Sequence, residues 1–206
     1  MLKELGGLVI VISAPAGAGK TTLCKRLLQD SPSFISSVSF TTRPPRKQEI
    51  EGVDYYFVTR SEFEKLARED AFVEWAEVHT HLYGTSRDFL QKNIDAGRDV
   101  VLEVDVAGGK KIKEQYSQAI LIFLVPPSWP ELEKRLQGRG TETGSSIERR
   151  LATAKEEIRQ LHFYDYFLVN NDIASTLTDL LSIIRAERHR ITRLSERELQ
   201  LIEAGE

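Results

Sequence analysis

The chain is poor in cysteine, in long apolar segments and in charge of one sign. Its 206 residues include a single cysteine, Cys24, which excludes a disulfide within the chain and indicates a reducing, cytoplasmic location. The longest apolar run, residues 119–125, is far shorter than the roughly 20 residues that span a bilayer, so no membrane helix is expected. The formal net charge of -3 gives no general attraction to nucleic acid or to an anionic membrane. We therefore expect a globular protein whose partners are small molecules.

Short apolar segments alternate with helix-like segments along much of the chain. Residues 8–13, 100–106, 119–125 and 166–170 are runs of apolar and β-branched residues, too uniform for strands with one face in water. A helix-like stretch separates each run from the next, and the first helix is expected at residues 20–29. The pattern predicts an α/β fold in which helices flank a central parallel sheet.

Residues 36–88 break this alternation, with prolines, short strand-like pieces and one predicted helix. Ser61 and Glu64 have the spacing of a capping box and are expected to start that helix. We predict a separate small subdomain in this region. The core is then formed by residues 1–35, 89–127 and 162–186.

A second insertion, residues 128–161, is strongly charged and helical, which is typical of a mobile lid. Ser145 and Glu148 form another predicted capping box, after a glycine-bearing turn at residues 138–144. The end of the chain, residues 187–206, is charged, with apolar residues at helical spacing, and predicts a surface helix.

The strongest chemical motif follows the first predicted strand. It comprises Ala14, Pro15, Ala16, Gly17, Ala18, Gly19, Lys20, Thr21 and Thr22. At a strand-to-helix junction, unpaired backbone N–H groups and the helix dipole favour a phosphate, and small residues let the backbone wrap around it. Lys20 is predicted to neutralise the β- and γ-phosphates of a nucleoside triphosphate, and the Thr21 hydroxyl to lie near a phosphate-bound Mg²⁺. Ala14 stands where the strict pattern has glycine, and an ordinary tight turn is the alternative interpretation.

Two carboxylates, Glu103 and Asp105, lie two residues apart near the end of the second predicted strand. Alternate residues of a strand project to the same face, and ligands of parallel sheets bind at the carboxyl ends of the strands. One carboxylate could support Mg²⁺ while the other contacts a substrate, but the spacing does not separate the two roles. A solvated strand end is the alternative.

Arg43 and Arg46 lie on either side of two prolines, which hold the chain extended and exclude a helix. A planar guanidinium makes paired hydrogen bonds to phosphate oxygens, so two arginines three residues apart can converge on one phosphate. An ordinary surface loop rich in arginine and proline is the alternative.

Two other residue types invite a chemical interpretation that the sequence does not support. Cys24 lies on the helix after the phosphate loop without an evident acid–base partner, so we expect it to pack in the core. His79 and His81 lie two apart in a predicted strand, without the cysteines or the tight acidic cluster of a zinc site. We predict no structural metal.

A series of further motifs follows the phosphate loop in a fixed order. The first is the segment from Ser39 to Arg46, followed by Glu49, Gly52 and residues 54–57. Others occur at residues 72–76, 83–85, 103–105, 135–142, 146–151 and 169–172. In this order the motifs resemble those of the guanylate kinase family, and the resemblance covers about residues 7–186. Several independent motifs in order are far more specific than one phosphate loop.

The resemblance implies a site for GMP. Its phosphate would be held by Arg43, Arg46, Tyr55 and Tyr83, and its base surrounded by Ser39, Glu74, Thr85 and Asp105. Guanine presents N1–H and an exocyclic amine, two donors that the Glu74 carboxylate can accept, whereas adenine has no N1–H. A buried carboxylate left unpaired by the wrong base is costly, which gives discrimination. Taken singly, the tyrosines could be core residues and Glu74 could simply flank a strand.

The resemblance also implies the catalytic residues. Arg135, Arg139 and Arg150 would belong to a lid that closes over ATP and brings positive charge to the transferring phosphoryl group. Phosphoryl transfer needs alignment and charge neutralisation, so no nucleophilic side chain is required, and Lys20 and Arg43 complete the expected catalytic set. A solvated helix face is the alternative for the lid arginines. Asn171, beside Asp172, is expected at the edge of the adenine site.

Taken together, the resemblance implies an α/β P-loop kinase with inserted GMP-binding and lid subdomains. It would transfer the γ-phosphoryl group of ATP to GMP, or to dGMP, with Mg²⁺ held near Thr21 and Glu103. No nucleic acid or membrane partner is expected, and the oligomeric state, monomer or dimer, is left open. One alternative is a non-catalytic guanylate-kinase-like module that binds phosphopeptides, against which the intact Gly19, Lys20 and Thr21 argue. The other is a kinase for a different nucleoside monophosphate, against which Glu74 and Ser39 argue.

Overall fold

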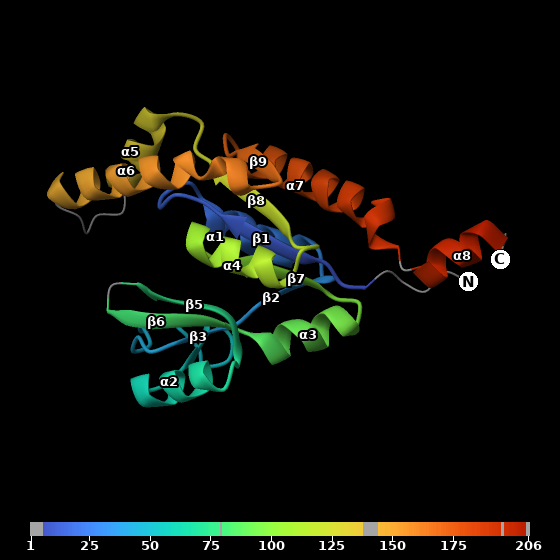
Figure 1. Ribbon diagram of the computed structural model, residues 1–206. Helices are drawn as coiled ribbons and strands as arrows, with labels where there is room; N and C mark the ends of the chain where they lie inside the picture. Colours follow the sequence, from blue (N-terminus) through green and yellow to red (C-terminus); the bar gives the residue numbers. More distant parts are fainter. Residues whose placement is uncertain (1–5, 79, 138–143, 195, 205–206) are drawn as a thin grey trace.

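A five-stranded parallel sheet forms the centre of the molecule (Figure 1). The computed structural model describes residues 6–78, 80–137, 144–194 and 196–204. The strand order is β2 (Phe34–Ser36), β7 (Asp99–Glu103), β1 (Val9–Ser13), β8 (Ile120–Val125) and β9 (Tyr166–Val169). All neighbouring strands in this sheet pair in parallel. The predicted α/β fold with a central parallel sheet is therefore confirmed.

Helices cover both faces of this central sheet. They are α1 (Lys20–Asp30), α3 (Arg87–Asp95), α4 (Val106–Gln115) and α7 (Ile173–Arg188). Leu27 of α1 and Leu180 of α7 belong to one apolar cluster, and Leu90 of α3 and Ile112 of α4 belong to the cluster on the other face. Cys24 is buried in the first cluster, as predicted for a core residue. Within the described ranges, no helix has the length and apolar character needed to cross a membrane.

Strand β7 ends three residues earlier than the sequence pattern predicts. Asp105 is the N-cap of α4, and its Oδ1 accepts a hydrogen bond of 2.8 Å from the backbone N of Gly108. Because this cap starts the helix at Val106, the strand ends at Glu103. The assumption that Glu103 and Asp105 alternate along one strand is therefore wrong, although both residues face the same cavity, as described below.

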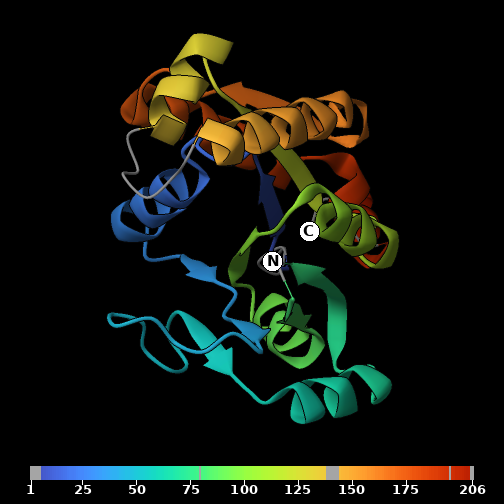
Figure 2. The same cartoon turned by 90° about the vertical axis from the view of Figure 1, so that its left-hand side faces the viewer.

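A second sheet lies to one side of the central one (Figures 1 and 2). Its strand order is β4 (Tyr55–Phe57), β3 (Ser39–Thr41), β6 (His81–Ser86) and β5 (Phe72–Val78). Strands β3 and β4 are parallel, and the other pairs are antiparallel. Helix α2 (Arg60–Arg68) covers this sheet, and Phe63 of the helix packs against Phe72 and Leu82 in a small core of its own.

The N-cap of helix α2 lies two residues before the predicted cap. Thr59, not Ser61, is the N-cap: its hydroxyl accepts from the backbone N of Glu62, and the Glu62 carboxylate accepts from the backbone N of Thr59. The pairs Thr59–Glu62 and Ser61–Glu64 have the same spacing, so the pattern cannot separate them. The earlier pair adds half a turn of helix and satisfies the backbone N–H groups of Thr59 and Glu62.

Helices α5 (Trp129–Gln137) and α6 (Gly144–Arg159) pack together on the other side of the central sheet from the second sheet. Leu132 and Leu136 of α5 contact Ala154 of α6 in a separate apolar cluster. Most of the predicted glycine-bearing turn lies outside the described residues. Helix α6 begins at Gly144, so Ser145 lies inside its first turn and the prediction that Ser145 caps this helix is wrong.

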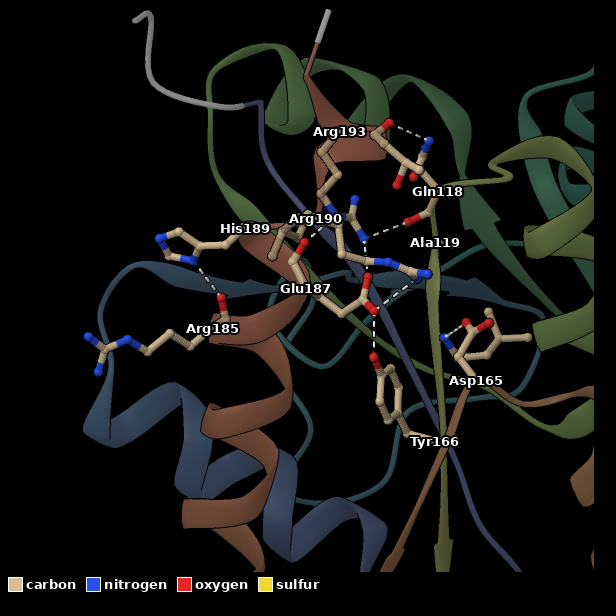
Figure 3. Close-up of polar contacts among 12 residues, drawn as sticks. Gln118, Ala119, Asp165, Tyr166, Arg185, Glu187, His189, Arg190 and Arg193 are labelled. Carbon is tan, nitrogen blue, oxygen red and sulfur yellow. Dashed lines mark hydrogen bonds and ion pairs between the residues drawn. The ribbon is translucent and has the colours of Figure 1, made fainter. Parts of the chain in front are cut away.

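The end of the chain is not one continuous helix, and polar contacts hold the segment after α7 against the core (Figure 3). After α7, the chain forms short turns and then α8 (Glu196–Ala204). The carboxylate of Glu187 is buried, and it accepts hydrogen bonds from Tyr166 and Arg193 over 2.6 Å and 2.9 Å. Arg193 also donates to the backbone oxygen of Gln118. A buried charge must be paired in this way, so these contacts hold residues 187–193 against the core.

Candidate active site

The phosphate loop between β1 and α1 depends on two glycines with left-handed backbone. Gly17 has φ of 88° and Gly19 has φ of 97°. A Cβ atom on Gly19 would lie 2.3 Å from Nδ2 of Asn170, so a side chain at this position would displace Asn170 in addition to straining the backbone. Ala14 is not among the residues with positive φ and packs in the central core. Alanine is therefore compatible with the first position of the motif, where the usual residue is glycine.

Asn170 ties the phosphate loop to the central sheet, and the sequence argument missed it. It follows β9, and its Nδ2 donates to the backbone oxygen of Ala18 over 2.7 Å. Nη2 of Arg135 donates to the backbone oxygen of Asn170 over 3.3 Å. These residues enclose what we name the phosphate-loop cavity, with a volume of about 290 Å³. It is lined by Gly17, Gly19, Thr22, Arg135, Asn170, Asn171 and Ile173.

A second hollow, which we name the strand cavity, also has a volume of about 290 Å³. It is lined by Ser39, Tyr55, Glu74, Ala76, Val78, Tyr83, Glu103, Val104 and Asp105. These residues come from all four strands of the second sheet, from the end of β7 and from the connection between β7 and α4. The structure thus brings together residues expected at the GMP site from segments up to 66 positions apart (Ser39 to Asp105).

The phosphate loop contacts the wall of the strand cavity directly. Nζ of Lys20 donates to the backbone oxygen of Val104 over 3.0 Å. The hydroxyl of Thr21 donates to Oε2 of Glu103 over the same distance of 3.0 Å. Glu103 and Val104 line the strand cavity, so the cationic end of the phosphate loop and the second site share one boundary.

Glu74 is the buried carboxylate of the strand cavity. Its Oε1 accepts a hydrogen bond of 2.6 Å from the hydroxyl of Thr85, which fixes the carboxylate in the cavity wall. Burial raises the pKa of Glu74, the hydrogen bond from Thr85 opposes this shift, and the nearby charge of Asp105 adds to it. The arrangement offers a positioned hydrogen-bond acceptor that a ligand with matching donors can satisfy.

Arg43 and Arg46 meet at Glu49, another residue that sequence reasoning did not assign to the site. Nη2 of Arg43 lies 2.8 Å from Oε1 of Glu49, and the backbone N of Arg46 donates to Oε2 over 2.8 Å. The hydrogen bond from Arg43 lowers the pKa of Glu49. The Arg43 guanidinium lies 5.5 Å from the ring centroid of Tyr55, which packs edge-on against Tyr83. The Arg46 side chain is exposed.

The remaining predicted residues lie on or near α5 and α6. Arg135 is on α5, where it pairs with Glu131, and Arg150 is half-buried on α6. Arg139 lies outside the described residues, as does His79. Among the residues that are described, no cluster of three or more His, Cys, Asp or Glu side chains could hold a metal ion.

Glu157 of α6 is a third residue that the sequence argument missed. Burial raises the pKa of Glu157 to about 7, the charge of Lys20 opposes the shift, and that of Asp105 adds to it. Because α6 is rich in charged residues, the sequence suggests a solvated helix and gives no reason to expect Glu157 to be partly buried. The apolar spacing of Leu151 and Ala154 gives a signal, because it places Glu157 one turn further along the inward side of the helix.

The fold and these two cavities define a class of protein. A parallel α/β sheet presents a phosphate loop at the end of its first strand, and the lysine of this loop contacts the wall of a second ligand-sized cavity. This arrangement is that of a P-loop kinase, in which a phosphate donor and a phosphate acceptor bind side by side.

Comparison with known proteins narrows the class. The model of the family described as "Guanylate kinase" matches residues 7–187. Guanylate kinases from Caldanaerobacter subterraneus and Syntrophotalea carbinolica are 42% and 46% identical, covering 96% and 91% of this chain and 96% and 90% of their own. The crystal structure of guanylate kinase from Anaplasma phagocytophilum matches with a TM-score of 0.79 at 35% identity, over 97% of this chain and 95% of that one. The chain belongs to the guanylate kinase family.

Proposed function

We propose that this protein is an ATP:GMP phosphotransferase, which transfers the γ-phosphoryl group of ATP to GMP and yields ADP and GDP. ATP would bind at the phosphate loop and in the phosphate-loop cavity, and GMP in the strand cavity. One observation carries the proposal: Lys20 donates to the backbone of Val104, which lines the strand cavity. A γ-phosphate held by Lys20 would therefore lie next to an acceptor in that cavity, as transfer requires.

Glu74 supports guanine as the base. Its carboxylate is buried and is held by Thr85, and it would accept from N1–H and the exocyclic amine of guanine. Ser39 and Asp105 line the same cavity and would complete the contacts around the base. Adenine would leave the buried carboxylate without a matching donor, at a cost of roughly 1–3 kcal/mol or more.

Charge neutralisation supports the proposed catalytic roles. Arg43, with Arg46, Tyr55 and Tyr83, would hold the phosphate of GMP, and it would exchange its contact with Glu49 for phosphate oxygens. Lys20 with the arginines at positions 135, 139 and 150 would neutralise the transferring phosphoryl group. The attacking nucleophile is a phosphate oxygen of GMP, so the chain needs only to align the substrates and exclude water.

Mg²⁺ fits the residues at the boundary of the two cavities. The hydroxyl of Thr21 and the carboxylate of Glu103 lie 3.0 Å apart, and both are hard oxygen ligands of the kind that Mg²⁺ prefers. Thr21 and Glu103 would hold the ion directly or through water. When bound, the ion would neutralise charge on the ATP phosphates.

The acceptor specificity tests the proposal. ADP release with ATP and each of GMP, dGMP, AMP, UMP and dTMP should be fast only with GMP and dGMP. We expect dGMP to react because the proposed contacts are made to the base and the phosphate, not to the 2′-hydroxyl. Equal turnover of AMP and GMP, or no turnover of either, would contradict the proposed function.

We also propose a cytoplasmic location, in keeping with the single unpaired cysteine and with ATP as substrate.

A further inference from the structure

Helix α4 contacts strand β5 on both sides of Glu74. Nζ of Lys111 donates to the backbone oxygen of Trp75 over 2.8 Å. Nε2 of Gln115 donates to the backbone oxygen of Val73 over 2.6 Å. Lys111 and Gln115 are four residues apart on the helix, so they project from the same face. The main chain of Glu74 is therefore held by α4 on each side.

Gly108 extends this face of α4 to the Glu74 carboxylate itself. Gly108 lies three residues before Lys111, one turn along the same face. A Cβ atom at Gly108 would lie 3.1 Å from Oε2 of Glu74 and 3.4 Å from Oδ1 of Asp105. The absence of a side chain at this position lets the helix approach both carboxylates that are proposed to surround the base.

Arg87 orients the amide of Gln115. Its Nη1 donates to Oε1 of Gln115 over 2.6 Å. Because arginine can only donate, the amide oxygen faces Arg87 and the amide NH₂ faces the backbone oxygen of Val73. Arg87 also donates to the backbone oxygens of Asp70 and Phe72. The contact between Gln115 and β5 is thus one part of a connected network at the junction of the two sheets.

We propose that Lys111 and Gln115 are positioning residues for guanine recognition, which hold β5 so that the Glu74 carboxylate meets the base. The proposal rests on the proposed function, because it takes GMP as the acceptor. Helix α4 is anchored to the central sheet through Ile112, whereas β5 belongs to the second sheet. The two side chains therefore fix Glu74 relative to Asp105 and to the phosphate loop.

The strand order predicts which part of GMP binding depends on this contact. Strand β5 lies at one edge of the second sheet, and β4, with Tyr55, lies at the opposite edge. Contacts to the base should therefore weaken when α4 loses its hold on β5, and contacts to the phosphate should not.

Two variants remove the contacts without removing a proposed substrate ligand. Lys111→Met removes the donor to Trp75, and Gln115→Glu keeps the shape and the contact with Arg87 while placing an oxygen against the backbone oxygen of Val73. We expect each variant to raise the KM for GMP about three- to tenfold, the effect of one hydrogen bond. The kcat at saturating GMP and the KM for ATP should stay within about twofold of the wild type. Lys111→Arg, which retains a donor and the charge, should restore most of the lost affinity.

Selectivity between two bases distinguishes a role through Glu74 from a general destabilisation of the fold, which would affect both substrates equally. IMP retains N1–H and the 6-oxygen of GMP but lacks the exocyclic amine, so its affinity depends less on the position of Glu74. The ratio of kcat/KM for GMP to that for IMP should fall in both variants. Equal losses for GMP and IMP would contradict a role through Glu74.

The pH dependence of Lys111→Met gives a second readout. Burial and Asp105 raise the pKa of Glu74, while Thr85 and Lys111 oppose the shift. Glu74 must be ionised to accept two hydrogen bonds, so protonation weakens GMP binding as the pH falls. Without the Lys111 charge the pKa of Glu74 is higher, and the KM for GMP should start to rise at a higher pH than in the wild type.

Lys113→Met is the matched control. Lys113 lies on the same helix, but its ammonium binds the backbone oxygen of Ala119 and the carboxylate of Asp165. This variant should lower the thermal midpoint and leave the KM for GMP and the GMP-to-IMP ratio unchanged. If folded Lys111→Met and Gln115→Glu had the wild-type KM for GMP and the wild-type GMP-to-IMP ratio, the inference would be overturned. A fall in kcat together with a rise in the KM for ATP would also overturn it. Wild-type protein without GMP turnover would instead refute the proposed function.

Discussion

The phosphate loop and the strand cavity are built in different ways. The loop is one contiguous segment whose shape rests on the backbone of Gly17 and Gly19. The strand cavity is lined by residues from the four strands of the second sheet, from the end of β7 and from the connection before α4. Backbone groups can bind the phosphates of any nucleoside triphosphate, whereas side chains such as Glu74 select one base. We therefore expect the phosphate loop to determine the rate of phosphoryl transfer and the strand cavity to determine which acceptor is used.

The largest expected effect is on the loop side. Lys20→Met removes the charge that would meet the transferring phosphoryl group, and we expect kcat to fall about 10²- to 10³-fold with any acceptor. The thermal midpoint should change little, because the lost hydrogen bond to Val104 is only partly buried. Lys25→Met, at an exposed position of the same helix, is the control and should retain full activity. Near-normal turnover by folded Lys20→Met would show that this loop does not contribute to phosphoryl transfer.

The second effect is on the cavity side. Glu74→Gln replaces one carboxylate oxygen by an NH₂ group that would face the donors of guanine. We expect kcat/KM for GMP to fall roughly 10- to 100-fold, the range for a hydrogen bond to a charged group. Steady-state kinetics with GMP as the varied substrate measures this loss. A variant with unaltered kcat/KM would show that Glu74 does not contact the base.

A third prediction concerns the backbone of the loop. Gly19→Ala combines a left-handed φ with a clash against Asn170, and Gly97→Ala has a similar φ of 74° but nothing within 4 Å of its Cβ. We expect Gly97→Ala to lose about 1–2 kcal/mol of unfolding free energy from the φ strain alone. Gly19→Ala should lose more, because Asn170 must also move away from Ala18. Urea denaturation of both variants measures the difference, and equal losses would mean that the loop tolerates a side chain there.

The smallest expected effect concerns stability as a function of pH. Burial raises the pKa of Glu157 to about 7 from its usual value of 4.5. Between these values the folded state binds a proton that the unfolded state lacks, so this residue makes stability fall as the pH rises from 4.5 to 7. In the absence of nucleotide, Glu157→Gln should therefore raise the thermal midpoint at pH 8 more than at pH 5. If the variant and the wild type differed in thermal midpoint by the same amount at pH 5 and pH 8, Glu157 would be solvent-exposed with an ordinary pKa.

The phosphate loop and the central sheet could be predicted because their signals are local. The buried parallel strands appear as apolar runs, and the motif from Ala14 to Thr22 is contiguous. The end of β7 could not be predicted, since the apolar residues Val104 and Val106 continue the pattern while the Asp105 cap decides the boundary. The two overlapping capping patterns at the start of α2 posed the same problem.

The strand cavity could be predicted only through the resemblance, because its residues are far apart in the sequence. Nothing local separates Glu74, which is buried, from Glu77 on the same strand, which is exposed. Asn170 and Glu157 were missed because they interact with distant segments: Asn170 donates to the phosphate loop, and the charge of Lys20 acts on Glu157. The roles of Arg139 and of the other site residues in catalysis stay predictions.

One assay with two variants tests the division between the loop and the cavity most directly. The ratio of kcat/KM for GMP to that for AMP would be measured in the wild type, Lys20→Met and Glu74→Gln. We predict that Lys20→Met lowers both rates and leaves the ratio near its wild-type value, whereas Glu74→Gln lowers the ratio at least tenfold, or about 1.4 kcal/mol of selectivity. If the GMP-to-AMP ratio fell in Lys20→Met and stayed at its wild-type value in Glu74→Gln, this division between the loop and the cavity would be wrong.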